Sequence, residues 1–349
     1  MKHAYLSWLA DETAFSWNND SALQPQIEAA LAQGAIGITT NPPLSYEALT
    51  AETDAYGEKL AALDKSLPSL EYAFLAMGLV VGRYSGFFMD MHEKKGDFYG
   101  CVRAQVAPSL RHDAEGMLEM GRRLSQIGKN VMVKIPGTKA GIWVLEELAA
   151  LGIPTNPTVI TTVAQALEAA KAHERGRERA IKSGIAPAWS SCAVVMGRTQ
   201  DYFAKLNEER KLGLAKADLD WASLAIVKRS AEIYKKEGFN SKIMPAAFRA
   251  PMQVEQLAGG EYHATIHPTV QAAVEEAYRE GAIKKGLFFE APIDEGAIRR
   301  VSGALPEFGQ AYEPDGLSMD EFDSCGSVTM TLDAFEATGW TKLASLKNA

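Results

Sequence analysis

Lys134 is the residue of this chain whose position points most directly to chemistry. It follows the apolar residues Val131–Val133 near the end of a strand-like run, and a helical pattern begins at Thr138. An ammonium group is costly among apolar neighbours, so burial lowers the pKa of a lysine. A neutral amine at the end of a barrel strand can attack a ketone and form a Schiff base. The ordinary alternative is a strand-end lysine that extends its charge into solvent.

Polar side chains also end or follow the other strand-like runs, and chemistry in parallel barrels collects where strands end and loops begin. These residues are Asp11, Asn41, Gln105, Asn156, Thr158, Arg198, Arg249 and His267. Each type has an ordinary role, because Asx and Thr residues cap helices, arginines form surface ion pairs, and Gln and His satisfy buried groups. Their joint occurrence around one lysine favours a catalytic site.

Eight strand-like runs alternate with helical patterns along most of the chain. We predict strands at Tyr5–Ala10, Ala35–Thr39, Cys101–Val106, Val131–Ile135, Ile153–Thr158, Ser190–Met196, Lys242–Pro245 and Tyr262–Ile266. Helices are predicted between them, as at Ala114–Ile127 and Thr138–Leu151. This rhythm predicts an α/β protein built as a (β/α)8 TIM barrel. A doubly wound open sheet is the alternative, but no Gly-x-Gly-x-x-Gly motif follows the first run and no P-loop occurs.

Two regions depart from this rhythm. The charged segment Ala169–Ser183 is predicted to extend the helix after the fifth strand on a solvated face. After Phe289 the chain changes character, and we predict helices at Asp294–Ser302 and Met319–Thr338 that pack outside the barrel. We therefore expect a catalytic barrel domain over residues 1–290 and a C-terminal helical extension over residues 291–349, packed on the barrel.

Composition excludes several classes of protein. The chain has 349 residues, of which 47% are hydrophobic, so it can bury a large core. The net charge of -8, without a basic stripe, argues against a nucleic-acid binder. Cys101, Cys192 and Cys325 are too widely spaced for a Cys-x-x-Cys motif, which favours reduced thiols in a cytoplasmic protein. The histidines lack metal-binding spacing, so we predict no metal.

No membrane segment is expected either. The N-terminal residues reach Asp11 before a signal-like apolar core is complete. The apolar run Phe74–Val81 is cut short by Arg83, so it is too short to span a bilayer and is predicted to be part of a buried helix.

Several segments resemble the transaldolase family of class I aldolases. The matching segments are Thr39-Thr40-Asn41-Pro42, the run around Lys134, Ala-Gln-Ala at 164–166, Gly197-Arg198, Ala247-Phe248-Arg249 and Thr265-Ile266-His267-Pro268-Thr269. They follow one another in the family's order, roughly over residues 5 to 285. The resemblance implies a (β/α)8 barrel, sugar phosphate substrates and no cofactor. It implies neither nucleic acid nor membrane as a partner, and a homodimer stays open.

The resemblance also implies a role for each site residue. Lys134 would attack the ketone of a ketose phosphate, and Asp11 would accept the proton of the C4 hydroxyl as the C3–C4 bond breaks. A dihydroxyacetone unit would stay on Lys134. A transaldolase passes that unit to an aldose phosphate, whereas an aldolase hydrolyses it off. The two asparagines, Asn41 and Asn156, would hold the bound carbon skeleton. Arg198 and Arg249 would bind the phosphate.

The chain departs from the family at three positions. Transaldolases carry a glutamate at the position of Gln105, where it handles protons with a water and the threonine that matches Thr158. A glutamine can orient that water but cannot take up a proton. Fructose 6-phosphate aldolases do carry glutamine there, but their tyrosine before the arginine corresponds to Val195. The serine that helps to hold phosphate corresponds to Ala247.

Transaldolase-type transfer is therefore our leading interpretation. An aldolase that uses free dihydroxyacetone is the first alternative. The second is a sugar-phosphate-binding barrel that has lost turnover, because function resides in sites rather than in folds.

Overall fold

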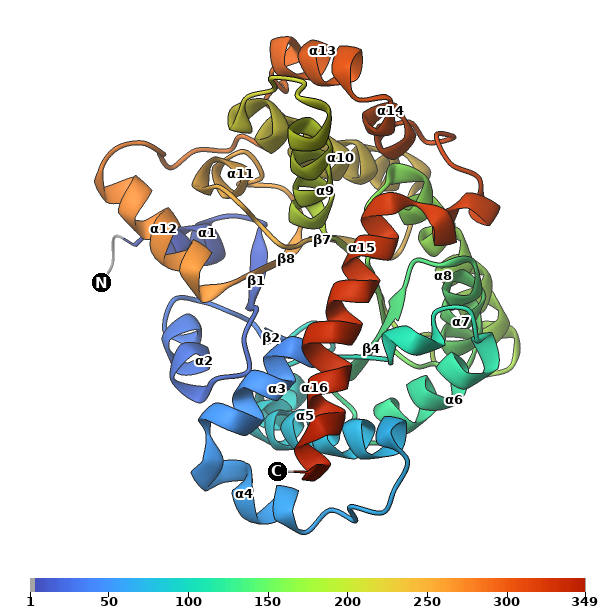
Figure 1. Cartoon of the computed structure of the whole chain (residues 1–349). Helices are drawn as coiled ribbons and strands as arrows, with labels where there is room; N and C mark the ends of the chain where they lie inside the picture. The colour runs from blue at the N-terminus through green and yellow to red at the C-terminus, as the bar shows by residue number, and fades with distance from the viewer. Residues whose placement is uncertain (1–3, 349) are drawn as a thin grey trace.

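Eight short strands surround a common axis and helices cover them from outside (Figure 1). The computed structural model describes residues 4–348. The strands are β1 (Ser16–Asn19), β2 (Ile38–Thr39), β3 (Val102–Gln105), β4 (Val131–Pro136), β5 (Thr155–Thr158), β6 (Ser191–Val194), β7 (Lys242–Pro245) and β8 (His263–Ile266). All pairings between them are parallel. The ladder β5-β4-β3-β2-β1-β8 and the pair β6-β7 are joined by single bridges between β5 and β6. The predicted (β/α)8 barrel is confirmed.

The helices of the barrel layer follow the strands in chain order. They are α2 (Gln24–Leu31), α3 (Pro42–Ala51), α4 (Thr53–Ala61), α5 (Ser69–Lys95), α6 (Ala114–Ser125), α7 (Lys139–Ala150), α8 (Val163–Lys182), α9 (Met196–Arg210), α10 (Lys216–Glu237), α11 (Pro251–Glu255) and α12 (Pro268–Arg279). Thr138 caps α7 by accepting a hydrogen bond from the Gly141 backbone at 3.1 Å. The charged segment after β5 does extend α8, as predicted.

Seven of the eight predicted strands are found, and the first is wrong. Residues 5–12 form helix α1 (Tyr5–Glu12), which buries Tyr5, Leu6 and Leu9 on one side. A short apolar run does not distinguish a strand from a helix, and here helical spacing prevails. The true first strand, Ser16–Asn19, is largely polar, since Asn18 faces the barrel interior and hydrogen-bonds there.

Helix α5 is the one helix within residues 4–348 that is long and apolar enough, by length and composition, to cross a membrane. Tyr72, Met77, Val80 and Phe88 of this helix are buried in the main core. The prediction of a buried helix over Phe74–Val81 is confirmed, because the apolar face of α5 packs on the barrel rather than facing outward.

The C-terminal region divides into two parts. Helix α13 (Glu295–Ala304) packs outside the barrel against α10, as predicted, and α14 (Pro306–Tyr312), which was not predicted, packs there too. The predicted helix Met319–Thr338 is wrong in extent. A 3₁₀ turn, η2 (Met319–Ser324), ends at Cys325, and α15 (Gly326–Phe335), a π-helical turn (Glu336–Trp340) and α16 (Thr341–Ser345) follow.

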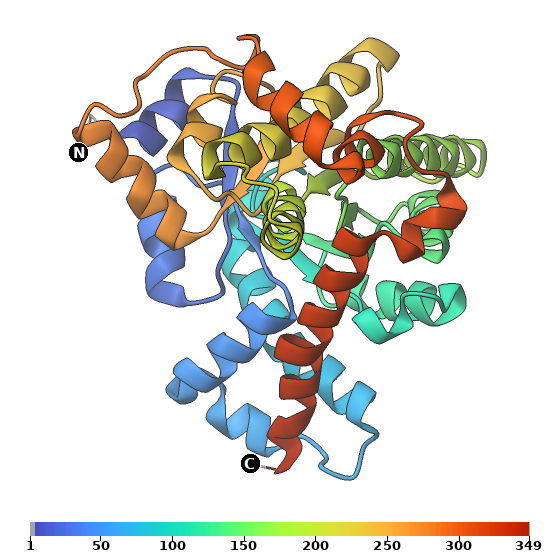
Figure 2. The ribbon, with the colours of Figure 1, turned by 45° about the horizontal axis from the view of Figure 1, so that its top comes forward.

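Residues 326–345, here called the C-terminal strap, pack over the end of the barrel, apart from α13 and α14. In both views the strap runs across the end of the barrel, from the α8–α9 side to α5 (Figures 1 and 2). It contacts segments that follow strand ends: Ser327 Oγ donates to Thr161 Oγ1 at 2.8 Å, and Gly339 packs on Pro42 and Pro43. The strap therefore covers the end of the barrel where the strands finish.

Candidate active site

Three neighbouring strands place Gln105, Lys134 and Asn156 side by side. Gln105 is opposite Lys134 in the β3–β4 ladder, and Lys134 is opposite Asn156 in the β4–β5 ladder. Directly opposed residues point to the same face of a sheet, so the three side chains share one layer of the barrel interior. Lys134 is 7% exposed and both amides are fully buried.

The surroundings of Lys134 favour its neutral form. Its Nζ donates a hydrogen bond to the Thr40 carbonyl at 3.1 Å. Burial lowers the pKa of Lys134 to about 8, with Arg103 acting in the same direction and Asp20 opposing it. At neutral pH roughly a tenth of the amine is thus unprotonated. A strand-end amine of this kind can act as a nucleophile.

Asp20, and not Asp11, is the carboxylate that follows the first strand. Its Oδ1 accepts a hydrogen bond from Thr39 Oγ1 at 2.6 Å, and Thr39 is in turn 2.5 Å from Thr265 Oγ1. The charge of Asp20 acts on both Lys134 and Arg198. Asp11 lies exposed on α1, so the placement expected for it at a strand end is wrong. The strand that positions Asp20 was not predicted because the sequence of β1 is largely polar.

Asn156 and Thr158 project from β5 into the barrel. The Asn156 amide nitrogen donates to the Ser191 backbone carbonyl and to Ser191 Oγ, the latter at 3.1 Å. Its Oδ1 has no partner among the described residues, and neither do the two amide atoms of Gln105. Thr158, two residues beyond Asn156, is also buried. Three buried polar atoms near the lysine are therefore free to bind a substrate or a water.

Asn41 and His267 serve as helix caps. The Asn41 side chain accepts a hydrogen bond from the Leu44 backbone at 3.0 Å and caps α3. His267 caps α12 by accepting from the Thr269 backbone at 3.3 Å. Each follows its strand at the covered end, so Asn41 is positioned near the site while its Oδ1 is engaged with the helix.

The two arginines differ in their partners. Arg249 binds Asp201 through two hydrogen bonds of 2.9 and 2.7 Å. The guanidinium of Arg198, in the first turn of α9, forms no hydrogen bond or ion pair with any residue within 4–348, and it lies 5.3 Å from the ring centre of Phe335. Burial, with a contribution from Arg249, lowers the pKa of Arg198. Arg198 is thus a cation with unused donors.

The segments that carry these arginines pack tightly on each other. A Cβ added at Gly197 would lie 1.8 Å from the Ala247 carbonyl oxygen and 2.8 Å from Arg249 Cζ. Only glycine fits there, so Gly197 permits the close approach of the segments that carry Arg198 and Arg249. Ala247 itself has a positive φ of 58°, a strained conformation for a residue with a side chain.

The order and placement of these residues agree with one known family. The sequence profile described as Transaldolase/Fructose-6-phosphate aldolase matches residues 19–302. The chain belongs to this family. The similarity to the transaldolase/fructose-6-phosphate aldolase family thus extends over most of the chain. The matched region contains Asp20 and excludes both Asp11 and the C-terminal strap.

Two groups of transaldolase relatives align differently. A protein named Transaldolase from Neisseria meningitidis is 36% identical over 163 residues, which is 46% of each chain. Transaldolase 1 of Streptomyces coelicolor is 26% identical over 94% of this chain and 95% of its own length. Transaldolase 1 of Streptomyces avermitilis is 25% identical over 90% of this chain and 92% of its own length. The alignment thus spans about half the length of the Neisseria relatives and nearly all of the Streptomyces ones.

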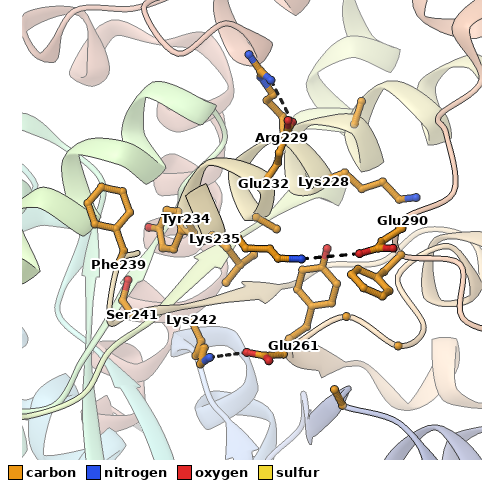
Figure 3. A pocket seen from close by; sticks show the side chains of 18 of the residues that line it. Lys228, Arg229, Glu232, Tyr234, Lys235, Phe239, Ser241, Lys242, Glu261 and Glu290 are labelled. Carbon is orange, nitrogen blue, oxygen red and sulfur yellow. Dashed lines mark hydrogen bonds and ion pairs between the residues drawn. The ribbon is translucent and has the colours of Figure 1, made fainter. Parts of the chain in front are cut away.

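A separate cavity of about 650 Å³ lies at the end of the barrel opposite the strap, where β7 and β8 begin (Figure 3). Its wall contains ion pairs between Lys242 and Glu261, at 2.8 Å, and between Lys235 and Glu290, at 3.7 Å. Lys134 does not line it.

The remaining basic groups of that cavity also have acceptors. Lys228 Nζ donates to the backbone carbonyls of Phe288 and Ala291, at 3.1 and 2.8 Å, and Arg229 pairs with Glu232. Among the basic residues of this cavity wall, only Lys228 has no carboxylate partner in the described part of the chain.

Proposed function

We propose that this protein transfers a dihydroxyacetone unit from a ketose phosphate to an aldose phosphate through a Schiff base on Lys134. The observation that carries the proposal is the buried Lys134 with a lowered pKa, set between two amide side chains at the covered end of the barrel. The printed names of the relatives, which are transaldolases, support the same reaction.

The chemistry would begin at the lysine. The Lys134 amine attacks the C2 ketone, water leaves, and the protonated imine withdraws electrons from the C3–C4 bond. Asp20 accepts the C4 hydroxyl proton as that bond breaks, so an aldehyde departs and an enamine stays on Lys134. The enamine carbon then attacks the acceptor aldehyde, which takes a proton back from Asp20, and hydrolysis frees the amine. Asp20 here takes the role first expected for Asp11.

Water handling would fall to Gln105 and Thr158. Loss and uptake of water at C2 need a water that is held beside the imine. Gln105 has both amide atoms unpartnered and lies next to Lys134, while Thr158 supplies a hydroxyl from β5. An amide orients such a water but does not exchange protons with it. The free Oδ1 of Asn156 and the amide of Asn41 would bind substrate hydroxyls.

Phosphate binding would rest mainly on Arg198. Its donors are unused, whereas the donors of Arg249 are largely occupied by Asp201 and by the carbonyls of Ala247 and Phe248. Arg249 would add positive charge at longer range. Charge-assisted hydrogen bonds to phosphate are stronger than neutral ones.

Gln105 is the observation that favours a second reaction, the cleavage or formation of ketoses with free dihydroxyacetone. A site without a titratable group at this position could release the three-carbon unit by hydrolysis instead of transferring it. A binder without turnover is the third candidate.

One experiment tests the chemistry and another separates the reactions. Borohydride reduction with a ketose phosphate, followed by peptide mass mapping, should label Lys134. Lys134→Met should abolish labelling, and Lys139→Met, on an exposed lysine paired with Asp320 at 2.5 Å, should not. Product analysis with and without an aldose phosphate then distinguishes transfer from aldol cleavage. Labelling of another lysine would overturn the assignment.

We further propose a cytoplasmic location. The three cysteines are free thiols, and Cys101 and Cys192 are buried, which suits a reducing compartment. Sugar phosphates are the proposed partners, and a homodimer remains a prediction.

A further inference from the structure

Arg103 lies inside the barrel, directly below the layer that holds Lys134. It precedes Gln105 by two residues on β3, and alternate residues of a strand point to the same face. Its partner in the ladder is Met132, which precedes Lys134 by two residues on β4. The Arg103 side chain is fully buried. The reactive layer therefore rests on a layer that contains a guanidinium group.

This guanidinium has no counter-ion within residues 4–348. Its Nη1 donates to Asn18 Oδ1 at 2.8 Å, while Nε and Nη2 have no partner. Its carbon lies 5.8 Å from the ring centre of Trp189. Burial lowers the pKa of Arg103 to about 10, so the group is still a cation at neutral pH. A buried, unpaired charge is destabilising, and such departures from good packing are expected at functional sites.

We propose that Arg103 is a positioning residue whose buried positive charge enlarges the neutral, nucleophilic fraction of the Lys134 amine. The inference rests on the proposed Schiff-base function and adds a residue to it. A like charge disfavours protonation of a nearby amine, and solvent screens the repulsion weakly inside a protein.

The other charged groups around Lys134 do not replace this effect. Asp20, after β1, has the opposite sign and favours the protonated amine. Arg198 and Arg249 lie in segments that follow β6 and β7, two and three strands around the barrel from β4. His263, at the start of β8, is neutral, because burial and the charge of Arg103 lower its pKa to about 3. The ladder neighbours Gln105 and Asn156 carry no charge.

The test is the pH dependence of imine formation. Dihydroxyacetone is the probe, because it has no phosphate whose ionisation would enter the profile. Initial rates of cyanoborohydride trapping on Lys134 are followed by mass spectrometry across the neutral and alkaline range. Arg103→Gln keeps a group that can hydrogen-bond Asn18 but removes the charge. The midpoint of its trapping rate against pH should move up by roughly one pH unit. Arg103→Lys keeps a charge, and its midpoint should stay near the wild-type value.

Two further variants keep the test decisive. Asn18→Asp leaves Arg103 in place and supplies the missing carboxylate, so it should also raise the midpoint, even if Arg103→Gln does not fold. Arg122→Gln removes an exposed arginine from α6 and should leave the midpoint unchanged.

Each remaining outcome has one meaning. A folded Arg103→Gln or Asn18→Asp protein with an unchanged midpoint would overturn the proposal, as would an equal shift in Arg103→Lys. Failure to trap Lys134 in the wild-type protein would instead overturn the proposed function itself.

Discussion

The ring centre of Phe335 lies 5.3 Å from the guanidinium carbon of Arg198, so the C-terminal strap contacts the arginine with unused donors. Phe335 belongs to a small apolar cluster with Val159, Val328 and Leu332, which is separate from the main core. The strap is thus anchored on the loop after β5 and holds an aromatic face against Arg198. A cation held over an aromatic face is restricted in orientation.

Phe335→Ala should weaken binding of phosphorylated substrates. Loss of a partly buried cation–π contact of about 1 kcal/mol corresponds to a roughly fivefold rise in KM. Steady-state kinetics on phosphorylated and unphosphorylated ketoses should show the rise only for the former, with kcat nearly unchanged. Leu332→Ala, in the same cluster, is the matched control for lost packing. Equal effects of the two variants would assign Phe335 to packing alone.

Asp20→Asn should block bond cleavage while leaving imine formation intact. Removal of a general base typically costs ~10²–10⁴-fold in rate. Borohydride trapping on Lys134 should persist, because the loss of a neighbouring negative charge favours the neutral amine. Asp11→Asn, on the exposed surface of α1, should keep the wild-type rate. Turnover near the wild-type rate in Asp20→Asn would require a different base.

Gln105→Glu should raise the transaldolase rate, by roughly tenfold if it restores a proton carrier beside Lys134. The rate profile should also gain a limb that reports the ionisation of the new carboxyl group. Gln105→Asn retains an amide without a titratable group and should show no such limb. If the rate and profile of Gln105→Glu match the wild type, then Gln105 lies outside the proton relay.

Lys134→Met should stabilise the protein at neutral pH. The folded-state pKa of about 8 lies below the ordinary 10.5, so the unfolded chain binds the proton more tightly. The charge of Lys134 therefore lowers the free energy of unfolding of the wild-type protein by on the order of 3 kcal/mol. This destabilisation is fully present below pH 8 and is relieved as the pH rises towards 10.5. Loss of the hydrogen bond to Thr40 subtracts part of the gain.

Urea unfolding of both proteins at neutral and alkaline pH measures this effect. The excess free energy of unfolding of Lys134→Met over the wild-type protein should decrease as the pH increases. Lys139→Met, on an exposed lysine, should show no such trend up to the same pH. An advantage that is independent of pH would mean that Lys134 is not destabilised by its charge.

The strand that carries Lys134 was predictable because the apolar run Val131–Val133 marks a strand buried on both faces. The pattern failed at β1, where inward residues such as Asn18 are polar and the apolar run lies instead in α1. The proposed base is therefore Asp20 and not Asp11, which lies on α1. Local periodicity reports which residues are apolar, but it does not report which polar residues a closed barrel turns inward.

The strap and the state of Arg103 could not be predicted for a different reason. A helical pattern over 319–338 was visible, but the surface on which such a helix packs depends on contacts with residues far away in sequence, such as Thr161 and Pro42. The missing counter-ion of Arg103 likewise becomes visible only when β1, β3 and β8 are brought together.

The order of synthesis gives the C-terminal strap one more consequence. A polypeptide leaves the ribosome N-terminus first, and early segments can fold before later ones emerge. All eight strands precede residue 326, so the barrel can close around Lys134 while the strap is still being made. During that interval the end of the barrel at which Lys134 lies is not yet covered by the strap. A chain released before residue 326 would thus leave this end of the barrel, and the lysine proposed to be reactive, uncovered by the strap.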